Sequence, residues 1–142
     1  MINLDQLYRQ VIMDNYKHPK NKGLITTGDY VNVHLKNPSR GDDISVSVKV
    51  ENNVLTDIRH DGVGCSICCS SASVASELLK GKTKEEAISI INDFFEMVKG
   101  EEVEDLERLD EAMAYQTVSS FPARIKCATL SWKAILEAIK EN

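Results

Sequence analysis

The stretch Gly62–Cys69 constrains the fold of this chain more than any other, because it places cysteines at a change of hydrophobic period. Before it, apolar and polar residues alternate, as in strands. After it, apolar residues recur every three or four positions, as in helices. Gly62 and Gly64 allow a tight turn at this junction. Cys65 is therefore expected at the start of a helix, where free amide groups and the helix dipole favour a thiolate.

Three segments before this junction predict an antiparallel sheet with one buried face. Asn52–Asn53 forms the expected turn between the second and third of them. A loop containing proline and glycine, Asn37–Asp42, separates the first from the second. The alternating apolar residues are Val31, Val33 and Leu35, then Ile44, Val46, Val48 and Val50, and the third strand is expected from Val54 to about His60.

The rest of the chain predicts helices. Asn3 with Gln6, and Thr83 with Glu86, are capping pairs that begin helices over 3–16 and from 84 to about 100. A helix from Cys65 is expected to stop at Gly81, and the acidic segment 101–109 predicts a short helix. Pro122 suits the first turn of a last helix. Strands followed by helices indicate an α+β fold, with helices on one face of a small three-stranded antiparallel sheet and residues 1–142 forming a single domain.

Composition restricts the classes of function. The net charge of −5 argues against nucleic-acid binding, which needs a basic surface. No apolar run approaches the roughly 18 residues that span a bilayer, and no signal peptide is recognisable, so we expect a cytoplasmic protein with no membrane partner. Cytoplasmic thiols stay reduced, so the four cysteines are expected to bind a metal, act in catalysis or lie buried.

Cys127, the cysteine outside the glycine-rich stretch, falls in the first turns of the last predicted helix. Arg124 and Lys126 add positive charge beside it. Asp42, in the loop between two predicted strands, can present a carboxylate. Two thiolates and one carboxylate are suitable ligands for zinc, or for the iron of an iron–sulfur cluster. We therefore predict that the fold brings Cys127 to Cys65 and that they form the functional site with Asp42.

The same motifs resemble the SufU branch of the IscU/SufU family, iron–sulfur cluster scaffold and sulfur-acceptor proteins related to the NifU N-terminal domain. The likeness covers nearly the whole chain. It is carried by the opening helix 4–14, by Asn37-Pro38-x-x-Gly41-Asp42, by Gly62-x-Gly64-Cys65 and by the segment Phe121–Leu130.

The resemblance implies a SufE/IscU-like fold and a metal surrounded by three cysteines and one aspartate. By position, Asp42, Cys65 and Cys127 match three of these ligands, and Cys65 and Cys127 are the candidate thiols for sulfur transfer. It also implies zinc, or a transient iron–sulfur cluster, and a partner of the SufS kind, a cysteine desulfurase that uses pyridoxal phosphate.

Arg40 is the departure from the family pattern, which has a cysteine there. In SufU-like members that cysteine is implicated in accepting sulfur. Arginine has no lone pair to offer a metal and cannot carry a persulfide. The expected site is therefore one ligand short and lacks its usual acceptor.

Two arrangements could compensate for Arg40. Cys68 or Cys69 could supply a substitute ligand, since both follow Cys65 within one helical turn. Alternatively, the Arg40 guanidinium could pair with the Asp42 carboxylate and leave the site without metal.

Three functional hypotheses follow from these residues. The first is a sulfur acceptor or scaffold that works with the desulfurase, with activity impaired by Arg40. The second is a regulatory variant that docks on the desulfurase without transferring sulfur. The third is a thiol redox protein that uses Cys65 and Cys68, which form a C-x-x-C motif.

Overall fold

The computed structural model describes residues 3–142 and contains one three-stranded antiparallel sheet in the order β1-β2-β3. The strands are β1 (Tyr30–Asn37), β2 (Asp42–Glu51) and β3 (Val54–Val63). Asn52 and Asn53 both have positive φ, as a tight two-residue hairpin requires. Pairs such as Val33–Val46 and Val48–Ile58 face the helices, while Asn32, Ser47 and Arg59 lie on the other face.

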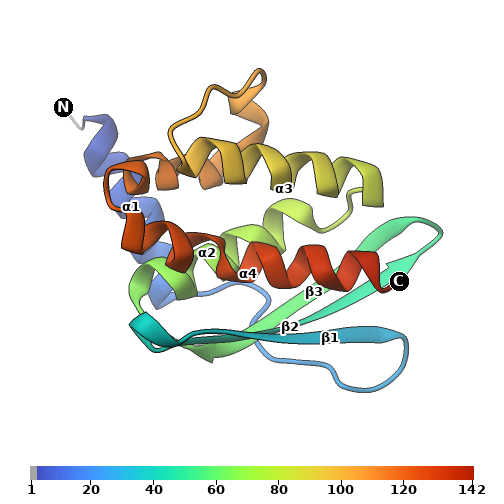
Figure 1. Ribbon diagram of the computed structural model, residues 1–142. Helices are drawn as coiled ribbons and strands as arrows, with labels where there is room; N and C mark the ends of the chain where they lie inside the picture. Colours follow the sequence, from blue (N-terminus) through green and yellow to red (C-terminus); the bar gives the residue numbers. More distant parts are fainter. Residues whose placement is uncertain (1–2) are drawn as a thin grey trace.

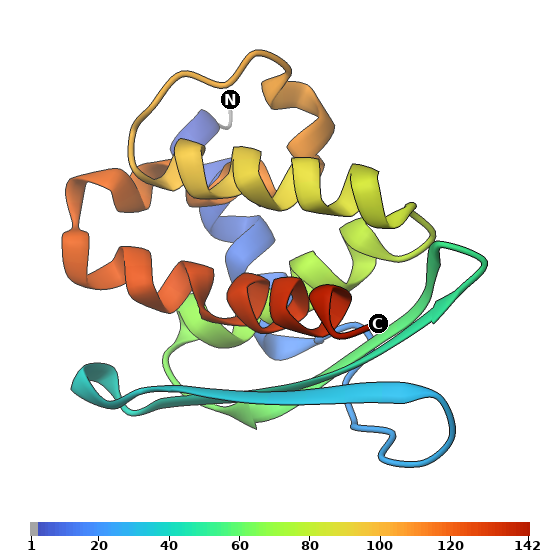
Figure 2. The same cartoon turned by 45° about the vertical axis from the view of Figure 1, so that its right-hand side comes forward.

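Four α-helices and a long 3-10 segment, η2, lie on one face of this sheet (Figure 1). Viewed after a 45° turn, α4 and α2 lie next to the sheet, and α3 and η2 form the layer beyond them (Figure 2). The predicted α+β fold is therefore confirmed. The bounds are α1 Leu4–Lys17, η1 Pro38–Arg40, α2 Ser66–Leu79, α3 Lys84–Val98, η2 Leu106–Ser120 and α4 Pro122–Lys140.

The predicted helix starts are confirmed in detail. Asn3 and Gln6 form a reciprocal capping box at the start of α1, and Thr83 and Glu86 form one at the start of α3. Each box satisfies amide groups that a helix start otherwise leaves unpaired. Cys65 is the N-cap residue of α2, as its place after the glycines predicts.

The acidic segment is the part of the secondary structure that was predicted wrongly. Residues 101–103 are irregular, and the helical segment η2 begins at Leu106 and continues to Ser120, with a kink at Asp110. Leu109 and Tyr115 are fully buried, and Tyr115 Oη lies 2.7 Å from Ser70 Oγ of α2. Where this segment is helical therefore depends on its contacts with the core, and the local sequence pattern does not show those contacts.

The core is organised around Trp132 of α4. Its ring stacks on Phe94 of α3 at 3.9 Å between centroids, and both side chains are fully buried. Its indole N–H donates to Ser71 Oγ of α2 at 2.8 Å, and that hydroxyl donates to the Ala128 carbonyl at 2.7 Å. A buried serine thus satisfies the one polar atom of the indole ring and fixes α2 against α4.

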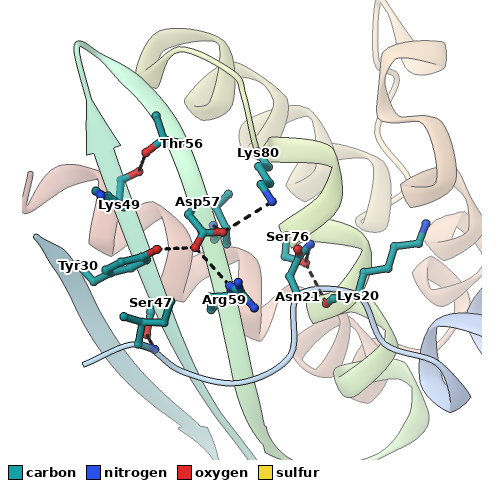
Figure 3. A network of polar contacts seen from close by, with 12 residues as sticks. Lys20, Asn21, Tyr30, Ser47, Lys49, Thr56, Asp57, Arg59, Ser76 and Lys80 are labelled. Atoms are coloured by element: carbon teal, nitrogen blue, oxygen red, sulfur yellow. Dashed lines mark hydrogen bonds and ion pairs between the residues drawn. The ribbon is translucent and has the colours of Figure 1, made fainter. Parts of the chain in front are cut away.

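The outer face of the sheet carries a polar network instead of a helical layer (Figure 3). The Asp57 carboxylate accepts a hydrogen bond from Tyr30 Oη at 2.5 Å and one from Arg59 Nε at 3.2 Å, and Lys80 Nζ lies 3.8 Å away. Burial acts to raise the pKa of Asp57, but the two hydrogen bonds outweigh it and the pKa is lowered. The network joins β1, β3 and the end of α2 across β2.

Three segments that are distant in sequence meet at one end of the sheet. The β1–β2 connection, the start of α2 and the start of α4 lie together there in both views (Figures 1 and 2). Within residues 3–142, no helix has the length and apolar character that a bilayer span requires.

We expect Ser71→Ala to destabilise the protein by about 1–3 kcal/mol, because it leaves the buried indole N–H of Trp132 without an acceptor. Chemical denaturation followed by tryptophan fluorescence measures the change. Ser66→Ala is the matched control on the same helix. Among residues 3–142 the Ser66 hydroxyl has no hydrogen-bond partner, so we expect a change within about 0.5 kcal/mol. Equal stability of the two variants would contradict the role of Ser71.

Candidate metal centre

Asp42, Cys65 and Cys127 come together at the end of the sheet where the three segments meet. A carboxylate oxygen of Asp42 and the two sulfur atoms all lie within 4.8 Å of one another. Asp42 is the first residue of β2, Cys65 caps α2 and Cys127 lies in the second turn of α4. The structure thus places the three residues together as the sequence predicts.

Two glycines make this approach possible. A Cβ added to Gly64 would lie 2.5 Å from Asp42 Oδ1, and one added to Gly62 would lie 2.0 Å from the Asp43 carbonyl oxygen. Gly62 also has a φ of +142°, which side chains rarely adopt. The glycines allow the loop before Cys65 to lie directly against the start of β2.

The Asp42 carboxylate is held by one hydrogen bond to each oxygen. The backbone N–H of Cys65 donates to Oδ1 at 3.0 Å, and Asn37 Nδ2 donates to Oδ2 at 3.1 Å. Asp42 is 2% exposed, so these bonds compensate for lost hydration. The carboxylate is fixed in place before any ligand binds.

Asn37 is a site residue that the sequence interpretation treated only as part of a loop motif. Its amide also donates to Cys127 Sγ at 3.8 Å, and its carbonyl oxygen accepts a hydrogen bond from Ser39 Oγ at 3.0 Å. It is 7% exposed and ends β1. The signal that could have found it is a polar residue at an inward-facing strand position, two residues after Leu35.

The electrostatics of the site favour a cation. Burial, the neighbouring Asp42 carboxylate and the Cys65 thiol raise the pKa of Cys127 to about 12. Two thiolates and a carboxylate this close would repel one another strongly in a low-dielectric site. A divalent cation among them would remove that repulsion and stabilise the deprotonated thiols.

The donor set fits zinc. Cysteine sulfur and carboxylate oxygen are both common zinc ligands, and three converging side chains are the number found in zinc sites that keep one position open. Asp42, Cys65 and Cys127 would hold the ion. Asn37 and the Cys65 backbone N–H, which orient the carboxylate, would act as its outer support.

Cys68 and Cys69 are not part of the group of three. Cys68 is fully buried in the core, where burial raises the pKa of its thiol far above the usual value. The Cys69 thiol donates to the Gly64 carbonyl at 3.7 Å and lines a separate cavity of about 220 Å³ together with His60 and Lys22. Neither sulfur belongs to the converging group of three, and a substitute ligand from Cys68 or Cys69 stays a prediction.

Arg40 does not pair with Asp42, so the predicted ion pair is wrong. Arg40 is exposed at the end of η1, and among residues 3–142 its guanidinium makes no hydrogen bond or ion pair. The physical reason is that both Asp42 oxygens already have donors and lie buried below the loop.

The chain is similar to known proteins over almost its whole length. Residues 7–95 match the family described as the NifU-like N-terminal domain. A zinc-dependent sulfurtransferase named SufU, from Bacillus subtilis (strain 168), is 47% identical over 99% of this chain and 94% of its own. The iron–sulfur cluster assembly scaffold protein IscU of Streptococcus pyogenes serotype M1 is 40% identical, with coverage of 98% and 86%.

Solved structures also match the chain over almost its whole length. A putative iron–sulfur cluster assembly scaffold protein for the SUF system from Fervidobacterium islandicum AW-1 has a TM-score of 0.85 at 30% identity. The likeness covers 96% of this chain and 99% of that one. The NifU-like protein of Brucella abortus, with a TM-score of 0.85 at 19% identity, shares the fold.

We expect Asn37→Ala to weaken zinc affinity by about 10- to 100-fold, the usual cost of losing an outer-shell partner of a metal ligand. Competition with a chromophoric chelator measures the affinity. Asn32→Ala is the matched control, because Asn32 lies on the same strand and faces the outer side of the sheet. Equal affinities for the two variants would show that Asn37 has no positioning role.

We also expect zinc binding to release protons and to strengthen as pH rises. With its pKa raised to about 12, Cys127 is protonated near neutral pH, and only its thiolate can bind the metal. Each proton released makes the affinity rise about tenfold per pH unit. Calorimetry in two buffers of different ionisation enthalpy counts the protons. Cys69→Ala should show the same count, and a pH-independent affinity in the unmodified protein would contradict the raised pKa.

Proposed function

The chain belongs to the IscU/SufU family of NifU-like N-terminal domains, and on this premise we propose that it is a zinc-dependent sulfur acceptor in iron–sulfur cluster biogenesis. The observation that carries the proposal is the convergence of Asp42, Cys65 and Cys127 within 4.8 Å at one end of the sheet. Similarity to a protein named as a zinc-dependent sulfurtransferase supports the choice of zinc and of sulfur transfer.

The partner in this proposal is a cysteine desulfurase of the SufS kind, which uses pyridoxal phosphate and carries a persulfide on its own cysteine. Cys65 is the thiol best placed to meet such a partner, because it is half-buried whereas Cys127 is fully buried. It stands at the N-cap of α2, where its backbone N–H is bonded to the Asp42 carboxylate, so the start of the helix fixes its position.

The transfer step is an exchange between a thiolate and a persulfide. The Cys65 thiolate attacks the outer sulfur of the desulfurase persulfide, so that a bond forms between Cys65 Sγ and that sulfur. The sulfur–sulfur bond on the desulfurase breaks, and the desulfurase cysteine leaves as a thiolate. The proton on the transferred sulfur moves with it, so no oxidant or reductant is needed.

The other residues of the site keep Cys65 in position for this step. The Cys65 backbone N–H bonds to Asp42, and Asn37 holds the second oxygen of the same carboxylate. Zinc, when bound, would lower the pKa of the thiols and so set their reactivity. Asp42 and Asn37 therefore act as positioning residues for the acceptor thiol.

A second candidate function is that of a docking or regulatory protein that binds the desulfurase without accepting sulfur. Arg40 favours it, because this residue replaces the loop thiol that the family uses and lies exposed with no thiol beside it on η1. Such a protein would keep the fold and the docking surface but would not stimulate turnover.

The third hypothesis, a redox protein using Cys65 and Cys68, has no observation in its favour. Cys68 is fully buried within the core on the first turn of α2. Burial raises the pKa of its thiol and keeps it from solvent, which disfavours thiol exchange, and we do not propose this function.

Desulfurase turnover with and without the protein tests the proposal. We expect the unmodified protein to bind the desulfurase and to stimulate it weakly, because the usual acceptor position is Arg40. Arg40→Cys should raise stimulation at least about tenfold, by analogy with the loss that follows removal of a catalytic group.

Arg9→Gln is the control for the loss of an exposed arginine, since Arg9 lies on α1. Binding without stimulation by the unmodified protein, with stimulation restored in Arg40→Cys, would identify the docking function. Neither binding nor stimulation by any variant would overturn the proposed function.

A further inference from the structure

A cavity of about 220 Å³ lies between the end of α1, the last residues of β3 and the first turns of α2, and none of the three candidate metal ligands lines it. Two of its lining residues, Tyr16 and Val63, are 44% and 67% exposed, so the cavity opens to solvent. Its volume is below the roughly 300–1,000 Å³ of pockets that take drug-sized ligands. It therefore suits a molecule about the size of one amino acid.

The segment after α1 fixes one wall of this cavity and carries a positive charge to it. Lys22 forms a parallel bridge with His60 of β3. On either side of Lys22, the Asn21 carbonyl accepts the His60 N–H at 3.2 Å, and the Gly23 N–H donates to the His60 carbonyl at 2.8 Å. Asn21 also donates to Ser76 Oγ of α2 at 3.0 Å (Figure 3). Within residues 3–142 Lys22 forms no ion pair, so its ammonium is available to an anion that enters the cavity.

His60 presents a free hydrogen-bond acceptor to the cavity. Its Nε2 lies 2.7 Å from the Lys20 carbonyl, which can only accept, so Nε2 carries the proton of the ring. Burial lowers the pKa of His60 and keeps the ring neutral, so Nδ1 has a lone pair. His60 is 4% exposed, yet the sealed side-chain polar atom without a partner in residues 3–142 is Ser131 Oγ, not Nδ1. Nδ1, which has no partner among these residues either, therefore reaches open space, and the cavity that His60 lines provides it.

Cys69 adds a nucleophile to the same cavity. Its thiol is half-buried, and the hydrogen bond that it makes to the Gly64 carbonyl is long, at 3.7 Å. Burial, the Cys65 thiol and the Asp42 carboxylate raise the pKa of Cys69, while the charge of Lys22 acts against them. A thiol of this kind reacts slowly with reagents that only collide with it. A reagent held beside it in the cavity gains the advantage of proximity.

The groups that line the cavity match one class of reagent. Lys22 can pair with a carboxylate, and the lone pair of His60 Nδ1 can accept an N–H from an ammonium group. Asp61, also in the lining, adds a negative charge that favours the same ammonium group. Cys69 can attack a sulfur–sulfur bond. A disulfide of a small amino-acid thiol carries all three of the matching groups.

We propose that this cavity binds a small disulfide of the amino-acid type and that Cys69 forms a mixed disulfide with it. The inference goes beyond the proposed function, because the reaction needs neither the metal nor the desulfurase. The added group would replace the long hydrogen bond between Cys69 and the Gly64 carbonyl, one residue before Cys65. Cys69 would thus respond to the thiol–disulfide balance of its surroundings.

The reaction is a thiol–disulfide exchange in which atoms and electrons balance. The Cys69 thiol loses its proton to solvent, and the thiolate attacks one sulfur of the bound disulfide. A bond forms between Cys69 Sγ and that sulfur, while the sulfur–sulfur bond of the reagent breaks. The other half of the reagent leaves as a thiolate, so Cys69 is oxidised and that half is reduced. The disulfide itself is the oxidant.

Three disulfides that differ in their charged groups test the proposal on the unmodified protein. Cystine carries both carboxylate and ammonium groups, cystamine carries only ammonium groups, and dithiodipropionate carries only carboxylates. Fragmentation mass spectrometry assigns each adduct to one cysteine and gives its initial rate. The same reagents with the urea-unfolded protein give intrinsic rates for normalisation. We expect the normalised rate at Cys69 to saturate with cystine and to exceed the other two about two- to five-fold, the range for one exposed charge contact.

Two lysine variants test the charge that the cavity supplies. At low ionic strength, Lys22→Gln should lower the normalised rates with cystine and dithiodipropionate about two- to five-fold, and should not lower the rate with cystamine. Lys17→Gln is the matched control, because Lys17 is exposed in the last turn of α1 and does not line the cavity. Its three rates should equal those of the unmodified protein.

Two results would contradict the inference. Equal normalised rates for the three disulfides, or a cystine rate that rises linearly without saturation, would show that Cys69 reacts only through its exposure and would overturn the binding site. Lys22→Gln and Lys17→Gln variants with the same rates would overturn the role of Lys22 as the partner of the carboxylate.

Discussion

The buried carboxylate of Asp42 is the constraint on which the rest of the site depends. One oxygen accepts the backbone N–H of Cys65 and the other accepts the side-chain amide of Asn37. These two bonds join the end of β1, the start of β2 and the start of α2. The absence of a side chain on Gly64 permits the close contact, since a Cβ there would lie 2.5 Å from the carboxylate.

Burying a carboxylate between two thiols is unfavourable in the metal-free protein, and the surrounding core holds the arrangement together. Trp132, Phe94 and the Ser71 hydroxyl fix α4 and α2 against each other. That contact in turn sets the position of Cys127 relative to Cys65. Burial and the neighbouring Asp42 carboxylate and Cys65 thiol raise the pKa of Cys127, and a divalent cation would offset the charge repulsion among these groups.

Local patterns in the sequence predict the elements of the fold well, because the determinants of those elements are themselves local. The capping pairs at Asn3 and Thr83 and the two-asparagine turn specify their structures with neighbouring residues alone. The segment η2 was predicted wrongly because its helical part depends on burying Leu109 and Tyr115 against distant helices. Contacts between distant elements cannot be read from a local period.

In the candidate site, too, some residues could be predicted from the sequence and others could not. Asp42, Cys65 and Cys127 could be predicted from residue type and from the likeness to a family, and the structure places them together. Asn37 was missed, although the alternation along β1 places it on the inward face, because its bonds to Asp42 and Cys127 involve residues of other elements. The predicted pairing of Arg40 with Asp42 was wrong because proximity in sequence does not show that both carboxylate oxygens are already bonded and buried.

The number of sulfur atoms around bound zinc tests the central claim most directly. X-ray absorption at the zinc edge, on protein loaded with one equivalent of zinc in buffer free of added thiol, counts these atoms. We expect two sulfur neighbours, from Cys65 and Cys127, with oxygen donors completing the shell, one of them from Asp42. Three or four sulfur neighbours would show that Cys68 or Cys69 is recruited, and a failure to bind zinc at all would contradict the assignment of the site.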